Sequence, residues 1–183
     1  MEVKPPVFFK WTEARTELWS VVSWEPGASQ WSAQLCALEG SPVLGARTWR
    51  DRERIATTAA RQRPVAFDGK RFSSGPVEES IGPGDDDHDG EPGISIDVEH
   101  PRIGSGQVFV KQSATFSWTG DLGPDGRITG SIAYVAEQEQ LGATTWWLKN
   151  PMRTRAPETP RSTFVLSPLP AGATCDSIPL GSR

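Results

Sequence analysis

The residues best suited to chemistry are the carboxylates of the acidic segment 85–91, which reads DDDHDGE. Carboxylates at alternate positions converge on one point when the chain curls, and Gly90 allows a sharp turn. This spacing matches the first half of the EF-hand calcium pattern, in which a hard cation takes about six to eight oxygen ligands. The ligands that this pattern predicts for Ca²⁺ are Asp85, Asp87, Asp89 and Glu91.

The second half of the calcium pattern is missing. Ile96 stands where an EF-hand has its bidentate glutamate, and Asp97 or Glu99 would have to complete the coordination. The alternative interpretation is a solvated acidic loop that repels itself and holds no metal. No other cofactor is expected, because the chain has no phosphate-binding glycine motif.

Catalytic residue types are scarce. The only histidines are His88, inside the acidic segment, and His100, which precedes Pro101. The chain has no G-x-S-x-G nucleophile motif. Its other carboxylates fall on predicted strands, where outward-facing acids commonly serve solubility. The sequence therefore favours a protein that is not an enzyme.

The net charge of −4 conceals two opposed segments. Residues 47–76 hold eight basic and three acidic residues, whereas residues 77–100 hold nine acidic and no basic residues. The basic segment could bind an acidic protein surface, or the acidic segment of this chain or of a neighbouring copy. Nucleic acid is not expected as a partner. The predicted partner-binding residues are Arg47, Arg50, Arg54 and Arg61.

Eight tryptophans compensate for a chain that is poor in aliphatic residues. Each can bury on the order of 150–250 Å², so the favoured interpretation makes them core residues. In an alternative, Trp118, Tyr134 and Trp146 line one ligand pocket. Exposed tryptophan rings could instead stack on sugars.

The elements that must position these residues are strands. The length of 183 residues indicates one domain, and 18 Gly with 16 Pro favour turn-rich β structure over a helical bundle. Alternation and β-branched composition predict an antiparallel β-sandwich or small β-barrel. The predicted strands are 8–11, 16–24, 31–38, 94–100, 107–118, 127–138, 143–149 and 162–166, and the four from 94 to 149 form a meander.

Three further segments break the strand pattern. Residues 46–62 lack Gly and Pro and precede Pro64, which predicts one peripheral helix. Residues 73–93 are rich in Gly, Pro and carboxylates, which predicts a long acidic loop. Residues 150–183 are Pro-rich and are expected to form an extended C-terminal arm beyond a β-rich domain of residues 1–149.

The two cysteines, Cys36 and Cys175, lie 139 positions apart. Two reduced thiols are the favoured interpretation, and a disulfide between them is the alternative. No apolar run is long enough for a membrane helix, and the first residues do not follow a signal-peptide pattern. We therefore expect cytoplasmic synthesis of a soluble protein with no membrane partner.

These features favour a non-enzymatic structural module that docks into a larger assembly through protein–protein interactions. The segregated charges and the extended arm suggest a virion component, phage-like in composition. The alternatives are a small β-barrel ligand-binding protein or enzyme with a Trp/Tyr-lined pocket, and a carbohydrate-binding module.

Overall fold

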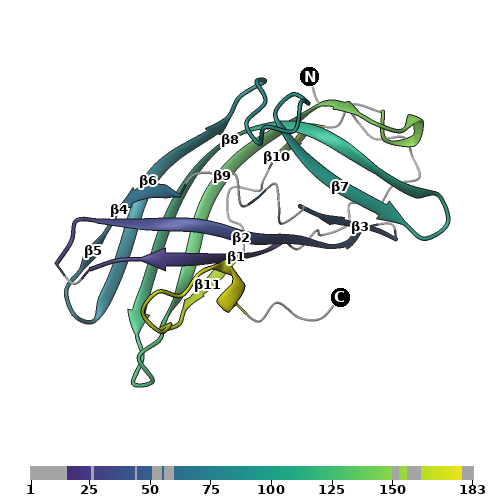
Figure 1. Cartoon of the computed structure of the whole chain (residues 1–183). Helices are drawn as coiled ribbons and strands as arrows, with labels where there is room; N and C mark the ends of the chain where they lie inside the picture. Colours follow the sequence, from purple (N-terminus) through teal and green to yellow (C-terminus); the bar gives the residue numbers. More distant parts are fainter. Residues whose placement is uncertain are drawn as a thin grey trace.

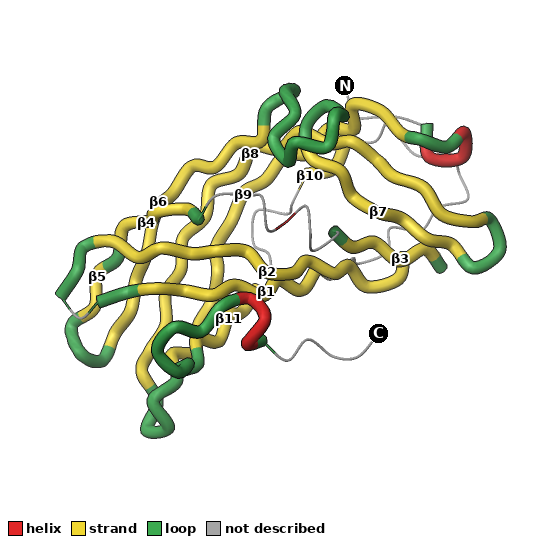
Figure 2. Tube along the Cα trace, viewed as in Figure 1, coloured by secondary structure: helices red, strands yellow, loops and turns green. Residues whose placement is uncertain are grey.

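The protein folds into one antiparallel sheet that curls into a half-barrel, as the computed structural model in Figure 1 shows. The structure describes residues 16–25, 27–43, 45–50, 55, 60–149, 153–155 and 162–178. Figure 2 shows that strands make up most of this part of the chain. Among the described residues, no helix has the length and apolar character needed to cross a membrane.

In the part of the chain that the structure describes, the sheet has eleven strands, and two short 3-10 turns lie after β9 and after β11. The strands are β1 (Thr16–Ser23), β2 (Gln30–Val43), β3 (Ala46–Trp49), β4 (Arg61–Pro64), β5 (Ala66–Phe67), β6 (Arg71–Ile81), β7 (Ile94–His100), β8 (Gly104–Leu122), β9 (Ile128–Ala143), β10 (Arg153–Arg155) and β11 (Ser162–Leu166). The turns are η1 (Trp146–Leu148) and η2 (Cys175–Ser177).

The strand order is that of an up-and-down meander in which three strands are interrupted. β3 and β4 lie end to end along one edge of β2, because Glu39 pairs with Trp49 and Ala33 with Arg61. β6 and β7 share one edge of β8 in the same way, and β10 and β11 share one edge of β9. In each of these pairs, the second strand follows the first in the sequence and lies on the same edge.

Several sequence predictions are confirmed. The protein is mainly β and antiparallel, and the strands 94–100 and 162–166 have the predicted bounds. The predicted strands 16–24, 31–38, 107–118 and 127–138 correspond to β1, β2, β8 and β9; β2 and β8 extend beyond both predicted ends, and β9 extends beyond its predicted C-terminal end. The predicted strand 8–11 lies outside the described residues.

The helix predicted over residues 46–62 is wrong at both ends. Ala46–Trp49 forms β3 between β2 and β7, and Arg61–Pro64 forms β4 on β2. Local helix preference is weak, and pairing with two neighbouring strands overrides it. Of the residues between, Ile55 is helical and buried, whereas 51–54 and 56–59 lie outside the described residues.

Two other boundaries differ from the prediction. The acidic loop is shorter than 73–93, because Ser73–Ile81 belongs to β6 and the loop is confined to residues 82–93. The strand predicted over 143–149 is wrong: β9 ends at Ala143 and the chain turns into η1. The Thr144 hydroxyl accepts a hydrogen bond from the backbone N–H of Gln107 (2.8 Å), which ends the regular ladder.

Two apolar clusters fill the concave side of the sheet. The first cluster centres on buried aromatic rings, with the centroid of Phe72 5.4 Å from that of Trp31 and 5.8 Å from that of Phe164. The second cluster, around Val98 and Val110, lies where β7 pairs with β8. The tryptophans of β2 and β8 are therefore core residues, as predicted, and they hold the curled strands together.

A disulfide joins Cys36 of β2 to Cys175 of η2, so the interpretation of two reduced thiols is wrong. The curl of the sheet brings together residues that are 139 positions apart in the sequence. The arm predicted over 150–183 is not confirmed. Its described parts include β10 and β11, which pair with β9, and η2, which the disulfide holds against β2.

Candidate functional site

The acidic loop, residues 82–93, leaves the sheet between β6 and β7. Ile81 pairs with Gln112 and Ile94 pairs with Val110, so the loop begins and ends beside positions of β8 that are two residues apart. At its base the N–H of Asp86 donates to the carbonyl of Gly93 (2.9 Å). The sheet therefore fixes both ends of the loop and forces its carboxylates to curl together.

The Asp85 carboxylate organises the tip of this loop. It accepts hydrogen bonds from the backbone N–H groups of Asp89 (3.0 Å) and Gly90 (2.9 Å). These bonds, chiefly that from Gly90, hold the pKa of Asp85 below its ordinary value of 3.8. The pattern D-x-D-x-D-G thus produces the expected local curl.

Asp87 points inward and is only 2% exposed. Its Oδ2 accepts hydrogen bonds from the guanidinium of Arg50 (3.2 Å) and from the backbone N–H of Ser95 (3.0 Å). Arg50 is itself buried and directly follows β3. A buried ion pair therefore joins the end of β3 to the acidic loop that precedes β7.

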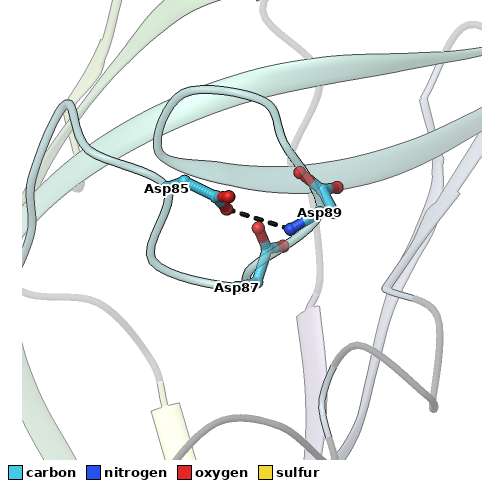
Figure 3. A group of neighbouring side chains, drawn as sticks. All are labelled: Asp85, Asp87 and Asp89. Atoms are coloured by element: carbon cyan, nitrogen blue, oxygen red, sulfur yellow. Dashed lines mark hydrogen bonds between the residues drawn. The ribbon is translucent and has the colours of Figure 1, made fainter.

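Asp85, Asp87 and Asp89 lie side by side in this loop (Figure 3), and one carboxylate oxygen from each lies within 4.8 Å of the others. The other predicted oxygens lie elsewhere. Glu91 is exposed and outside this group, and the Asp97 carboxylate accepts a hydrogen bond from the Gln107 side chain (2.9 Å). Three carboxylates can hold a divalent cation, but Asp87 already binds Arg50. Calcium binding here stays a prediction.

The predicted partner-binding arginines do not form one surface. Arg50 is buried, and Arg61 pairs with Glu79 through an Nη1–Oε2 contact of 2.8 Å. Arg47 is exposed on β3, with Glu99 as its cross-strand neighbour. Arg54 lies outside the described residues. Arg50 and Arg61 therefore bind carboxylates of residues 77–100 of their own chain, namely Asp87 and Glu79. This was one of the alternatives left open by the sequence.

Sequence reasoning missed a second charged group, which lies where β4 faces β6. Arg63 contacts Glu79 (Nη2–Oε1, 2.7 Å), so this carboxylate receives two guanidinium groups. The Arg63 guanidinium also lies over the rings of Trp118 (5.0 Å) and Trp31 (5.8 Å). Such cation–π contacts stabilise a charge that is removed from water. The alternation of Arg61 and Arg63 was the only sequence signal for this group.

The three pocket candidates are not brought together. Trp118 is buried in the first cluster, and Tyr134 is near it through Phe116, whose ring stacks on both. Trp146 lies on η1, beside the opposite end of β8, and is 81% exposed. About twelve residues of β8 separate the two places, which corresponds to roughly 40 Å of extended chain.

The two histidines lie at opposite ends of β7. His88 is exposed in the acidic loop with a φ of 57°, and His100 ends the strand. The Nδ1 atom of His100 accepts a hydrogen bond from the backbone N–H of Arg102 (3.1 Å). The two imidazoles are thus too far apart to share one site.

No protein-family model, curated protein or solved structure matches this chain. The class of protein is therefore defined by its architecture alone, as an antiparallel half-barrel with interrupted strands.

Proposed function

We propose that this chain is a non-enzymatic interaction module that docks into a larger assembly, of which a virus-like particle is one example. The observation that carries the proposal is how the charges are distributed. Arg50, Arg61 and Arg63 are used in ion pairs that hold interrupted strands together. The outer face of β8 and β9, in contrast, carries small hydroxyl and aliphatic side chains from Thr115 to Thr119 and from Ser131 to Val135, between the exposed Asp121 and Glu137.

The filled interior supports the same proposal. The rings of Trp31, Phe72 and Trp118 pack edge to face on the concave side, with centroids 5.4–6.0 Å apart. Their packing is that of a core, whereas a ligand-binding barrel needs an open cavity at this place. A rigid, curled sheet suits a protein that presents a surface.

The disulfide adds an argument about location. Disulfides form and persist in oxidising surroundings and are rare in the reducing cytosol. The bond between Cys36 and Cys175 thus fits a protein whose working form is outside the cytosol, as in a released particle.

The test is the sedimentation of the native protein from the material in which it is made. We expect the chain to sediment with a discrete large species and to dissociate from it in denaturant. A protein that stays monomeric throughout the gradient, and that turns over a substrate, would sink the proposal.

A carbohydrate-binding module is the alternative that one exposed ring favours. Trp146 is 81% exposed and could stack on a sugar. Such modules need a row of rings, and Trp146 is the only aromatic residue among the strongly exposed large hydrophobic residues that the structure describes. Binding to insoluble polysaccharide that is lost in Trp146→Ala would favour this alternative over the assembly module.

A further inference from the structure

The segment that follows β11 runs from one end of the sheet order toward the other. Among the described residues, β11 pairs only with β9, and β1 pairs only with β2, so these strands lie at opposite ends of the sheet. Residues 167–175, which we call the strap, connect β11 to η2, and the disulfide joins η2 to β2 (Figure 1, yellow). The strap therefore links the last strands of the sheet to the first ones.

The strap forms its described hydrogen bonds locally. The N–H of Ala173 donates to the carbonyl of Pro170 (3.1 Å), and in η2 the N–H of Ser177 donates to the carbonyl of Thr174 (2.9 Å). Residues 167–172 are all exposed. Among the described residues, the disulfide is the one bond that joins the strap to β2. Breaking this bond would therefore free the C-terminal end of the strap.

Cys36 lies at an irregularity of β2. Trp19 of β1 pairs with Ala37, and Ser20 pairs with Leu35, so Cys36 between them has no cross-strand partner on β1. A β-bulge of this kind turns a side chain out of the regular alternation of a strand. The sequence of β2 thus places one sulfur where the strap can meet it, and the sheet keeps that sulfur buried.

The two sulfurs of the bond belong to residues of different exposure. Cys36 is 3% exposed in the middle of β2. Cys175 is only partly buried, and it lies in a 3-10 turn that has no buried residue. A thiol can open a disulfide only through a sulfur that it can reach. The exposure of the two residues therefore directs attack to Cys175.

We propose that the strap is a redox switch: a small thiol such as glutathione forms a mixed disulfide with Cys175 and thereby opens the bond to Cys36. The thiolate forms a bond to Cys175 Sγ, and the electron pair of the broken bond leaves with Cys36 Sγ, which takes up a proton. A second thiolate then attacks the small-molecule sulfur. This step releases the oxidised small-molecule disulfide and leaves Cys175 as a free thiol. The switch goes beyond the assembly function and does not depend on it.

The reduced switch can close again. The Cys36 sulfur lies 3.5 Å from the carbonyl oxygen of Gln34, to which the thiol can donate a weak hydrogen bond. Local hydrogen bonds keep the turn Pro170–Ala173 and η2 in shape, and two thiols on one short tether have an effective concentration on the order of mM. We therefore expect the strap to be free in reducing surroundings and bound to β2 in oxidising ones.

The first test identifies the sulfur that is attacked. The folded, oxidised chain is exposed briefly to millimolar reduced glutathione, quenched in acid, and mapped by mass spectrometry of its peptides. We expect at least tenfold more glutathione on Cys175 than on Cys36. The same reaction in denaturant, where both sulfurs are accessible, is the control and should label both. Labelling chiefly on Cys36 in the folded chain, or a bond that glutathione opens only in denaturant, would overturn the inference.

The second test measures the release of the strap by limited proteolysis with elastase, which cuts after small residues. Ala171 is exposed in the strap, but a protease needs several residues of mobile chain, and the bound strap is fixed at both ends. We expect cleavage after Ala171 to be at least tenfold faster once the chain is reduced and the reductant removed. The double variant Cys36→Ser/Cys175→Ser should be cut as fast as the reduced chain.

Ala133 provides the control for this test, because it is exposed on the paired strand β9. Cleavage after Ala133 should stay slow in the oxidised and the reduced chain, which separates release of the strap from unfolding of the sheet. Equal rates after Ala171 with and without the disulfide would overturn the switch. Cleavage after Ala133 that accelerates together with that after Ala171 would overturn it as well.

Discussion

Asp87 is a carboxylate held inside the protein by a guanidinium from another interrupted strand. Removing two charges from water is expensive, and their attraction offsets that cost only while both partners are present. Arg50 is 5% exposed, so water cannot easily replace it when it is lost. The pair therefore fixes the position of the chain after β3 relative to the acidic loop before β7.

We expect Arg50→Met to reduce the free energy of unfolding by about 3–5 kcal/mol, because it leaves the Asp87 carboxylate buried without its cation. Urea denaturation followed by tryptophan fluorescence measures this change. Glu91→Gln, at an exposed position of the same loop, is the control and should change stability by less than about 0.5 kcal/mol.

A second substitution separates the charge from the packing. Asp87→Asn in the Arg50→Met background removes the unpaired charge, so the double variant should recover part of the lost stability. A double variant less stable than the sum of the two single effects would show that the pair does not act through its charge.

Calcium binding, which is a prediction, would require the cation to compete with Arg50 for the Asp87 carboxylate. In Arg50→Met the positive charge beside Asp87 is lost, so the oxygens of Asp85, Asp87 and Asp89 should bind a divalent cation more tightly. We expect millimolar Ca²⁺ to raise the melting temperature of this variant more than that of the unmodified chain, and excess chelator to reverse the rise. Equal melting temperatures with and without Ca²⁺ in both proteins would remove the calcium prediction.

At the scale of elements, the acidic loop must end where β7 begins its pairing with β8, at Ile94 and Val110. Gly93 makes that return with a φ of 79°, a conformation that side chains with a Cβ rarely adopt. A Cβ at this position would also overlap the carbonyl oxygen of Val110. The path of the loop, and with it the position of Asp87, depends on this glycine.

We expect Gly93→Ala to destabilise the protein by at least about 1–3 kcal/mol, from backbone strain together with the overlap. Gly84 in the same loop has open space around it, so Gly84→Ala is the matched control and should be nearly neutral. Urea denaturation of the two variants compares them. Equal stability of the two would show that the loop can return by another path.

At the scale of the whole molecule, the disulfide ties the segment after β11 to β2, near the opposite end of the sheet. Between Leu166 and Cys175 most described residues are exposed, so the bond is the main anchor of this segment. A bond across 139 positions restricts the unfolded chain strongly.

We expect the double variant Cys36→Ser/Cys175→Ser to lose about 2–5 kcal/mol of stability. Denaturant unfolding with and without reductant measures the loss. Reductant should lower the midpoint of the unmodified chain and leave that of the double variant unchanged. A midpoint that does not respond to reductant in either protein would show that the bond contributes nothing to stability.

Alternation predicted the strands well where every second residue is apolar and faces one cluster. Ile94, Ile96 and Val98 belong to the second cluster, and their period of two set the bounds of β7 correctly. Prediction failed where an element depends on a distant neighbour. The segment 46–62 has the composition of a helix, but β2 and β7 offer it backbone partners that a single sequence does not reveal.

The candidate site divides in the same way. The spacing of Asp85, Asp87 and Asp89 was visible in the sequence, and so was the opposition between the basic and acidic segments. That Arg50 binds Asp87, and that Arg61 and Arg63 share Glu79, follows from strands that lie side by side only after folding. Side-chain pairing needs separations of a few ångströms, which chain order does not determine.

The sequence by itself determined the β class, the position of the tryptophan core and the local curl of the acidic loop, because each depends on neighbours within a few residues. Only the tertiary structure decided which strands are interrupted, which charges cancel, and that Cys36 meets Cys175. It also brought the hydroxyl side chains of Ser73, Thr119, Ser131 and Thr163 into one row, since the pairing of four strands sets their register.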